Sequence, residues 1–114
     1  MVKPRQGDVY WVAFGVSGDS GSSGKRPAIV IQNDLLNRSN IRTTVVTLLT
    51  SNIKLSKVPG NVILHKGSAN LPKSSVAVVS QIATVDKNRL IEKIGTLERD
   101  TIEEILSGCQ MVIK

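Results

Sequence analysis

Apolar and β-branched residues in this chain come in short runs of strand length, and turn-forming residues separate the runs. The first run, residues 8–14, is apolar on both of its alternating faces, which predicts a strand that is covered on both sides. Further strands are predicted wherever the same composition returns between Gly, Pro, Asn and Ser. These later runs cover residues 25–32, 43–50, 61–65 and 75–82 and, with a weaker pattern, 91–97.

Helical spacing is found in two places. Asn33 and Asp34 offer a cap or a turn before a short helical piece near residues 35–38. Asp100 is predicted to cap a terminal helix, with Glu103 three residues on in the manner of a capping box. One face of that helix is apolar and is expected to pack on the sheet, which makes its cysteine a small core residue rather than a nucleophile. This face consists of Ile102, Ile105, Leu106 and Cys109.

Strands of this number with one terminal helix predict an α+β fold with a compact, barrel-like antiparallel sheet. The length of 114 residues fits a single domain, residues 1–114, with no internal repeat. No apolar run is long enough to span a bilayer, and the first residues contain no apolar signal segment. We therefore expect a cytoplasmic protein without a membrane anchor.

Positive charge is concentrated in the middle of the chain. The net charge is +6, and no acidic residue occurs between Asp34 and Asp86. Uneven charge is common in small basic proteins, but such a segment also suits a groove that binds phosphates. Its basic residues are Arg38, Arg42, Lys54, Lys57, Lys66 and Lys73.

Few residues are available for metal or acid–base chemistry. The chain has one cysteine and one histidine, His65, so it contains no disulfide framework and no pair of histidines. Metal-dependent nucleases need clustered carboxylates, and the only adjacent pair, Glu103 and Glu104, fits the solvated face of a helix. We expect neither a metal nor another cofactor.

RNA can be cleaved without a metal, because its own 2′-hydroxyl can attack the adjacent phosphate. The protein then needs a cation against the developing charge, help with proton transfer, and accurate positioning. Arg26, at the start of the second predicted strand, and Thr50, at the end of the third, could supply these. The sequence alone does not show that these two residues meet.

The sequence that surrounds these residues resembles the MazF/PemK family of toxin endoribonucleases over nearly its whole length, to about residue 106. An Arg-Pro strand that ends in Asn-Asp, followed by a Thr-Ser strand end, is a specific combination. The matching segments are Gly7-Asp8-Val9-Tyr10-Trp11, Gly24-Lys25-Arg26-Pro27, Ile31-Gln32-Asn33-Asp34, Leu49-Thr50-Ser51, residues 67–76 and residues 81–90.

The resemblance implies an SH3-like barrel with added helices that acts as a homodimer and cleaves single-stranded RNA without a metal. It also implies an antitoxin whose C-terminal segment occupies the RNA groove; from the charge of the chain we expect that segment to be acidic. Arg26 and Thr50 match the family's catalytic pair. Gln81 matches a glutamine near the RNA path, although a purely structural role for its side chain is an equal alternative. Ser51 lies beside the site. Charge adds Lys25, Lys54 and Lys57 as candidate RNA contacts.

Several alternatives stay open. Ala83 stands where many relatives have an arginine, which we expect to alter substrate preference or weaken binding without abolishing activity. The chain could instead be a same-fold poison of a topoisomerase, like CcdB, or an SH3-like module that binds RNA without cutting it. The Gly/Ser-rich segment at residues 15–24 is either a hairpin connection or a lid. Trp11 suits the core better than a platform for stacking bases.

Overall fold

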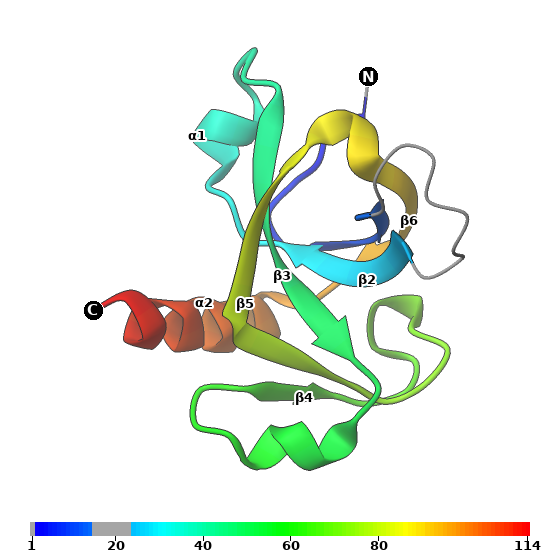
Figure 1. Ribbon diagram of the computed structural model, residues 1–114, viewed down its shortest axis with the longest axis vertical. Coiled ribbons are helices and arrows are strands. Elements are labelled where there is room, and N and C mark those ends of the chain that lie inside the picture. Colours follow the sequence, from blue (N-terminus) through cyan, green and yellow to red (C-terminus); the bar gives the residue numbers. More distant parts are fainter. Residues whose placement is uncertain (1, 15–23) are drawn as a thin grey trace.

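A curled antiparallel sheet of six strands forms the frame of the protein (Figure 1). The computed structural model describes residues 2–14 and 24–114, so the segment predicted as a hairpin connection or lid lies almost entirely outside the described residues. The strands follow the spatial order β4-β5-β3-β2-β1-β6, and every recorded pairing is antiparallel. They are β1 (Asp8–Ala13), β2 (Lys25–Val30), β3 (Thr43–Thr50), β4 (Val62–Leu64), β5 (Ser75–Asp86) and β6 (Leu90–Thr96).

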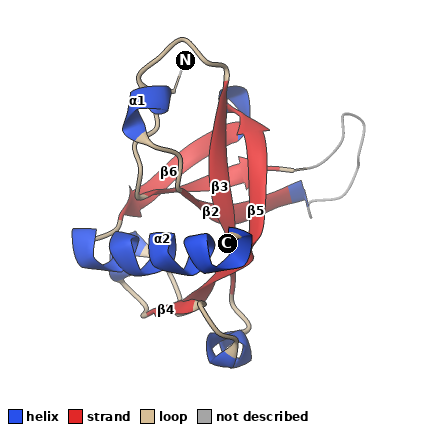
Figure 2. Cartoon of the chain, turned by 90° about the vertical axis from the view of Figure 1, so that its left-hand side faces the viewer, coloured by secondary structure: helices blue, strands red, loops and turns tan. Residues whose placement is uncertain are grey.

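Helices are attached to this half-barrel at its ends and along one side. Helix α2 (Arg99–Ile113) lies across the sheet, as Figure 2 shows, and α1 (Asp34–Asn37) precedes β3. Three short 3-10 helices complete the described elements: η2 (Ile53–Lys57), η3 (Ser68–Asn70) and η4 (Lys87–Arg89). Of the described helices, none combines the length and the apolarity that crossing a bilayer requires. The α+β architecture predicted from the sequence is confirmed.

Two clusters of buried side chains hold the sheet in its curled form. One lies between the sheet and α2, where Ile29 and Leu49 pack with Ile102 and Ile105. The other fills the curl itself and includes Tyr10, Val12, Val30 and Val46. Full burial of one such aliphatic side chain stabilises a fold by about 1.5–3 kcal/mol, so the two clusters contribute strongly to the stability of the curled sheet. Cys109 is 6% exposed within the first cluster, as predicted.

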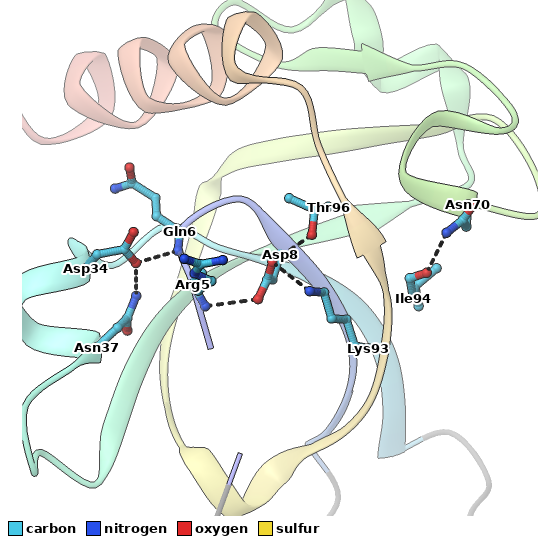
Figure 3. A network of polar contacts seen from close by, with 9 residues as sticks. All are labelled: Arg5, Gln6, Asp8, Asp34, Asn37, Asn70, Lys93, Ile94 and Thr96. Carbon is cyan, nitrogen blue, oxygen red and sulfur yellow. Dashed lines mark hydrogen bonds and ion pairs between the residues drawn. The ribbon is translucent and has the colours of Figure 1, made fainter. Parts of the chain in front are cut away.

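A buried carboxylate ties the first strand to the last (Figure 3). The Asp8 side chain is 2% exposed and accepts hydrogen bonds from the Arg5 amide at 3.0 Å and the Thr96 hydroxyl at 2.9 Å. The Lys93 ammonium lies 3.4 Å from the same carboxylate. A charge buried in this way is stable only when it is paired and hydrogen-bonded, and these contacts close the β1–β6 edge.

A kink in β5 lets one strand serve both halves of the sheet. Opposite β3, Thr47 pairs with Ile82 but the next residue, Leu48, pairs with Val78, so residues 79–81 have no partner in β3. The Thr47 hydroxyl donates to the Val78 carbonyl at 2.6 Å and fixes this irregularity. The predicted strand at residues 75–82 was therefore too short, because pairing resumes after the kink and continues to Asp86.

The predicted cap of the terminal helix was wrong. The helix begins at Arg99, Glu98 is the N-cap residue without a side-chain cap bond, and Asp100 lies in the first turn. Glu103 accepts from the Arg99 guanidinium at 2.6 Å, one turn apart, so it is engaged with Arg99. The cap of the short helix was predicted correctly, since the Asn33 side chain accepts from the Leu35 amide at 2.8 Å.

Candidate active site

The register of two neighbouring strands brings the predicted catalytic pair together. β2 and β3 pair as Ala28–Leu48, Ile29–Thr47 and Val30–Val46. Continuing this antiparallel register by two residues sets Arg26 level with Thr50. The recorded β2–β3 pairing ends at Ala28. Beyond it, Arg26 pairs only with Val12 of β1 and Thr50 only with Val76 of β5, so the facing edges of these two strand ends can border a pocket.

A pocket of about 260 Å³ opens at these strand ends. Three of the predicted site residues, Arg26, Thr50 and Ser51, line it together. The other lining residues come from β1, from β2 and β3, and from the segment that leads into β5. They are Trp11, Pro27, Leu49, Leu71, Pro72, Lys73 and Ser75.

One wall of the pocket is apolar. Trp11 pairs with Pro27 across β1 and β2, and Leu71, which is 4% exposed, anchors the loop on the other side. The Lys25 ammonium lies 5.0 Å from the centre of the Trp11 ring, a cation–π contact. Trp11 is half-buried and belongs to neither core cluster, so it is part of the pocket wall rather than the core expected from the sequence.

The polar side of the pocket offers donors. The Thr50 hydroxyl oxygen accepts from the Asn52 amide at 3.2 Å, which leaves its own O–H available to donate into the pocket. Arg26 is half-buried and has no ion pair within the described part of the chain. Ser75 donates to the Lys73 carbonyl at 3.1 Å and holds the backbone that carries Lys73. Arg26 and Lys73 give the pocket two positive side chains, and its described lining contains no carboxylate.

Not every predicted contact residue reaches this pocket. Lys54 and Lys57 are exposed on η2, which follows Thr50 by way of the Asn52 cap. Gln81 is exposed and lies in the β5 kink, away from the pocket lining. Lys73 lines the pocket although the sequence pattern predicted it only as part of the basic segment. Its position directly after Pro72 in a matched segment was the signal that could have identified it.

Comparison with known proteins identifies the family. Residues 5–113 match the family model described as "PemK-like, MazF-like toxin of type II toxin-antitoxin system". Endoribonuclease MazF2 of Mycobacterium bovis is 33% identical over 106 residues, which cover 93% of each chain. Endoribonuclease MazF of Staphylococcus saprophyticus is 38% identical over 101 residues, which cover 89% of this chain and 83% of the relative.

A solved structure supports the fold. An endoribonuclease from a mycobacterial species, in complex with its cognate antitoxin, superposes with a TM-score of 0.74 at 21% identity, covering 99% of this chain and 95% of the other. The family match spans almost the whole chain and contains the Arg-Pro and Thr-Ser strand ends that meet at the pocket. The chain therefore belongs to the family of PemK-like, MazF-like toxins of type II toxin–antitoxin systems.

Proposed function

We propose that this protein is an endoribonuclease toxin that cleaves single-stranded RNA at a short sequence, with Arg26 and Thr50 as its catalytic residues. The observation that carries the proposal is the meeting of these two side chains in one pocket at the ends of β2 and β3. The curated relatives named above are endoribonucleases, which supports the activity. The cytoplasm, where messenger RNA is translated, is the compartment that suits it.

The reaction we propose uses a nucleophile carried by the substrate. The 2′-oxygen attacks the adjacent phosphorus, the bond to the 5′-oxygen breaks, and the products are a 2′,3′-cyclic phosphate, which can open to a 3′-phosphate, and a 5′-hydroxyl. The proton lost from the 2′-hydroxyl passes to solvent. The leaving 5′-oxygen takes a proton from Arg26, which regains one from solvent.

Arg26 and Thr50 stabilise the same phosphate in this mechanism. A guanidinium can donate two parallel hydrogen bonds to phosphate oxygens, so Arg26 suits a phosphorane that carries extra negative charge. The Thr50 hydroxyl donates a further hydrogen bond while the Asn52 amide holds its oxygen in place at 3.2 Å. Removing one such preorganised donor typically costs about 10²–10³ in rate.

The apolar wall favours an unpaired base over a duplex. Trp11, Pro27 and Pro72 line the pocket beside the polar groups, and a base that leaves its stack can lie on such a surface. The position of Lys25 over the Trp11 ring and of Ser51 in the pocket lining supports a role for both in contacting the same nucleotides. Lys54, Lys57 and Gln81 lie outside the pocket and would contact nucleotides farther along the strand.

We further propose that the partner of this toxin is an antitoxin with an acidic C-terminal segment that competes with RNA for the pocket. The solved mycobacterial endoribonuclease was captured with its cognate antitoxin, which supports this kind of partner. The net charge of +6 favours association with both polyanions. An antitoxin that bound without displacing an RNA oligonucleotide would contradict a shared surface.

Mapping of fragment ends tests the proposed function. A long RNA is digested by the purified protein in excess EDTA, and the ends are sequenced and assigned chemically. Because the described pocket lining contains no carboxylate, we expect EDTA to leave the rate unchanged. A 2′-deoxy substitution at the cleaved nucleotide is expected to stop the reaction and largely preserve binding. Metal-dependent cleavage would overturn the mechanism, and intact RNA would favour the topoisomerase poison or the binding module.

A further inference from the structure

A second basic surface lies away from the pocket, at the end of the molecule where β3 begins. Two hollows of about 350 and 360 Å³ adjoin there and share Lys3, Asn37 and Arg38 as lining residues. Arg5 lines one of them and Lys87 lines the other. Figure 1 shows α1 and η4, the elements that carry Asn37 and Lys87, near this same end.

Lys87 is the unusual member of this surface, because a lysine is almost never fully buried without a partner of opposite charge. Its side chain is 3% exposed, and its ammonium donates to the Asn37 carbonyl at 3.1 Å. No carboxylate forms an ion pair with it within the described residues. The neighbouring Asp86 instead interacts with Arg42 at 4.0 Å and accepts from the Asn88 amide at 2.8 Å.

The charge of the two hollows stays positive after nearby acids are counted. Asp34 lies close enough to Arg5 and Arg38 for their charges to lower its pKa. Its carboxylate already accepts hydrogen bonds from the Gln6 amide at 2.8 Å and from the Asn37 side chain at 3.1 Å. The described lining contains four basic residues and no acidic one: Lys3, Arg5, Arg38 and Lys87. Arg38 is exposed, and both hollows are bordered by its side chain.

We infer that these joined hollows bind a backbone phosphate of the substrate RNA, at a distance from the phosphate that is cleaved. The inference rests on the proposed function for the identity of the ligand, and on Lys3, Arg38 and Lys87 for the site. A phosphate supplies the negative charge that Lys87 lacks, and its several oxygens can accept from Lys and Arg donors together. RNA supplies such groups at regular spacing, and phosphate contacts position a strand without reading its sequence.

The spacing between the two sites gives this inference a measurable consequence. The hollows lie at the Thr43 end of β3 and the pocket at its Thr50 end. Seven steps of about 3.3 Å along an extended strand separate these ends, so the sites are roughly 23 Å apart. An oligonucleotide of a few residues that fills the pocket leaves the hollows empty, whereas one several times longer reaches both.

Binding of two RNA lengths tests the inference without any need for cleavage. A three-nucleotide and a twenty-nucleotide RNA, both 2′-O-methylated so that no attack is possible, are titrated by fluorescence anisotropy at several salt concentrations. The variants are Arg38→Gln and Lys3→Gln, and the matched control is Lys114→Gln, which removes one charge from an exposed position outside both hollows. Lys87→Met is added, with urea unfolding to confirm that it folds.

For the long RNA, we expect Arg38→Gln to weaken binding about three- to tenfold more than the control. Its plot of log affinity against log salt should be shallower by about 0.7, the value for one lost contact to a single strand. For the short RNA, the Arg38→Gln and control proteins should bind alike. Inorganic phosphate at millimolar concentration should not displace the long RNA, because a free ion can occupy only one of the two sites that the RNA occupies together.

Two results would overturn the inference: equal losses of affinity for both RNA lengths, or an unchanged salt slope for the long RNA. If Lys87→Met fails to fold, the Arg38 and Lys3 variants still decide the question. The two proposals fail in different experiments. If the proposed function is wrong, the RNA stays intact in the fragment-end experiment. The dependence of binding on RNA length tests only the second site.

Discussion

At the scale of single residues, the pairing of Arg26 with Thr50 makes a prediction about rates. Arg26→Lys keeps a positive charge but loses the planar pair of donors, so we expect cleavage to fall by about 10²–10³. Thr50→Ser keeps the hydroxyl and should retain more activity than Thr50→Val, which keeps the shape and loses the donor. Single-turnover cleavage of one defined RNA measures all three rates.

Folding serves as the control for these variants. Neither Arg26 nor Thr50 belongs to a core cluster, so circular dichroism spectra and thermal midpoints should stay close to those of the unaltered protein. An Arg26→Lys protein that is folded and fully active would remove Arg26 from the catalytic pair.

Asp34 is a residue whose titration should be visible in the stability of the fold. Burial by itself would raise its pKa, but hydrogen bonds from the Gln6 amide and the Asn37 side chain, with Arg38 and Arg5 nearby, hold the pKa below its ordinary value. A lowered pKa favours the charged form in the folded state. Its contribution is therefore present above the unfolded pKa of about 3.9 and is lost as the pH falls through the folded value.

The variant Asp34→Asn tests this assignment. We expect it to unfold at lower urea concentration than the unaltered protein at pH 7, and the gap between the two midpoints should narrow as the pH falls below about 4. Urea titrations at pH 7 and at pH 3 measure the gap. A gap of constant size would mean that the carboxylate charge of Asp34 does not stabilise the fold.

At the scale of elements, a glycine of α2 packs closely against the turn at Gly60 and against β5. A Cβ atom added to Gly108 would collide with the Gly60 carbonyl and would lie 2.8 Å from a methyl group of Val79. Alanine usually stabilises a helix interior relative to glycine, but overpacking costs about 1–3 kcal/mol and decides the sign here. Gly108→Ala should therefore lower the free energy of unfolding.

The neighbouring residue provides the matched comparison for this substitution. Ser107 is exposed on the same helix, so Ser107→Ala should be neutral or slightly stabilising. Chemical denaturation of both variants gives the difference in free energy. If Gly108→Ala were as stable as Ser107→Ala, the contact between α2 and the Gly60 turn would not constrain the fold.

The elements also show where sequence patterns are sufficient and where they are not. The pattern of residues 43–50 predicted β3 at its observed bounds, because both its faces are packed and its ends are marked by turns. The continuation of β5 beyond residue 82 was missed, since it depends on the kink fixed by Thr47 and on the Asn61 side chain, which accepts from the Val79 amide at 3.1 Å. Such long-range bonds leave no local periodicity.

The candidate site divides in the same way. The strand ends that carry Arg26 and Thr50 could be assigned from the family's motifs, and the pocket contains both. The matched segment around Pro72 could have pointed to Lys73, but its place in the pocket wall depends on Leu71 being buried and on the Ser75 hydroxyl donating to the Lys73 carbonyl at 3.1 Å, which no local pattern shows. Total charge predicted a phosphate-binding surface, but only the fold shows Lys73 and Arg38 in separate hollows.

At the scale of the whole molecule, the distribution of exposed apolar residues predicts a symmetric dimer. The last turn of α2 carries Met111, Val112 and Ile113, which are 53%, 44% and 77% exposed. Apolar residues gathered at one place on a surface mark sites of protein contact, and the edge strand β4, which contacts α2, offers unpaired backbone. We therefore expect part of the sheet and the end of α2 to form the interface.

Sedimentation equilibrium at micromolar concentration measures this assembly. The unaltered protein should have about twice the chain mass of 12.3 kDa. Val112→Asp combined with Ile113→Asp places two charges in the interface and should give monomers whose circular dichroism is unchanged, because neither residue belongs to a core cluster. Gln110→Asp, at an exposed position of the same helix outside this apolar group, is the control and should remain dimeric. A mass of one chain for the unaltered protein would contradict the dimer, and a dimer that survives the double substitution would place the interface on the sheet alone.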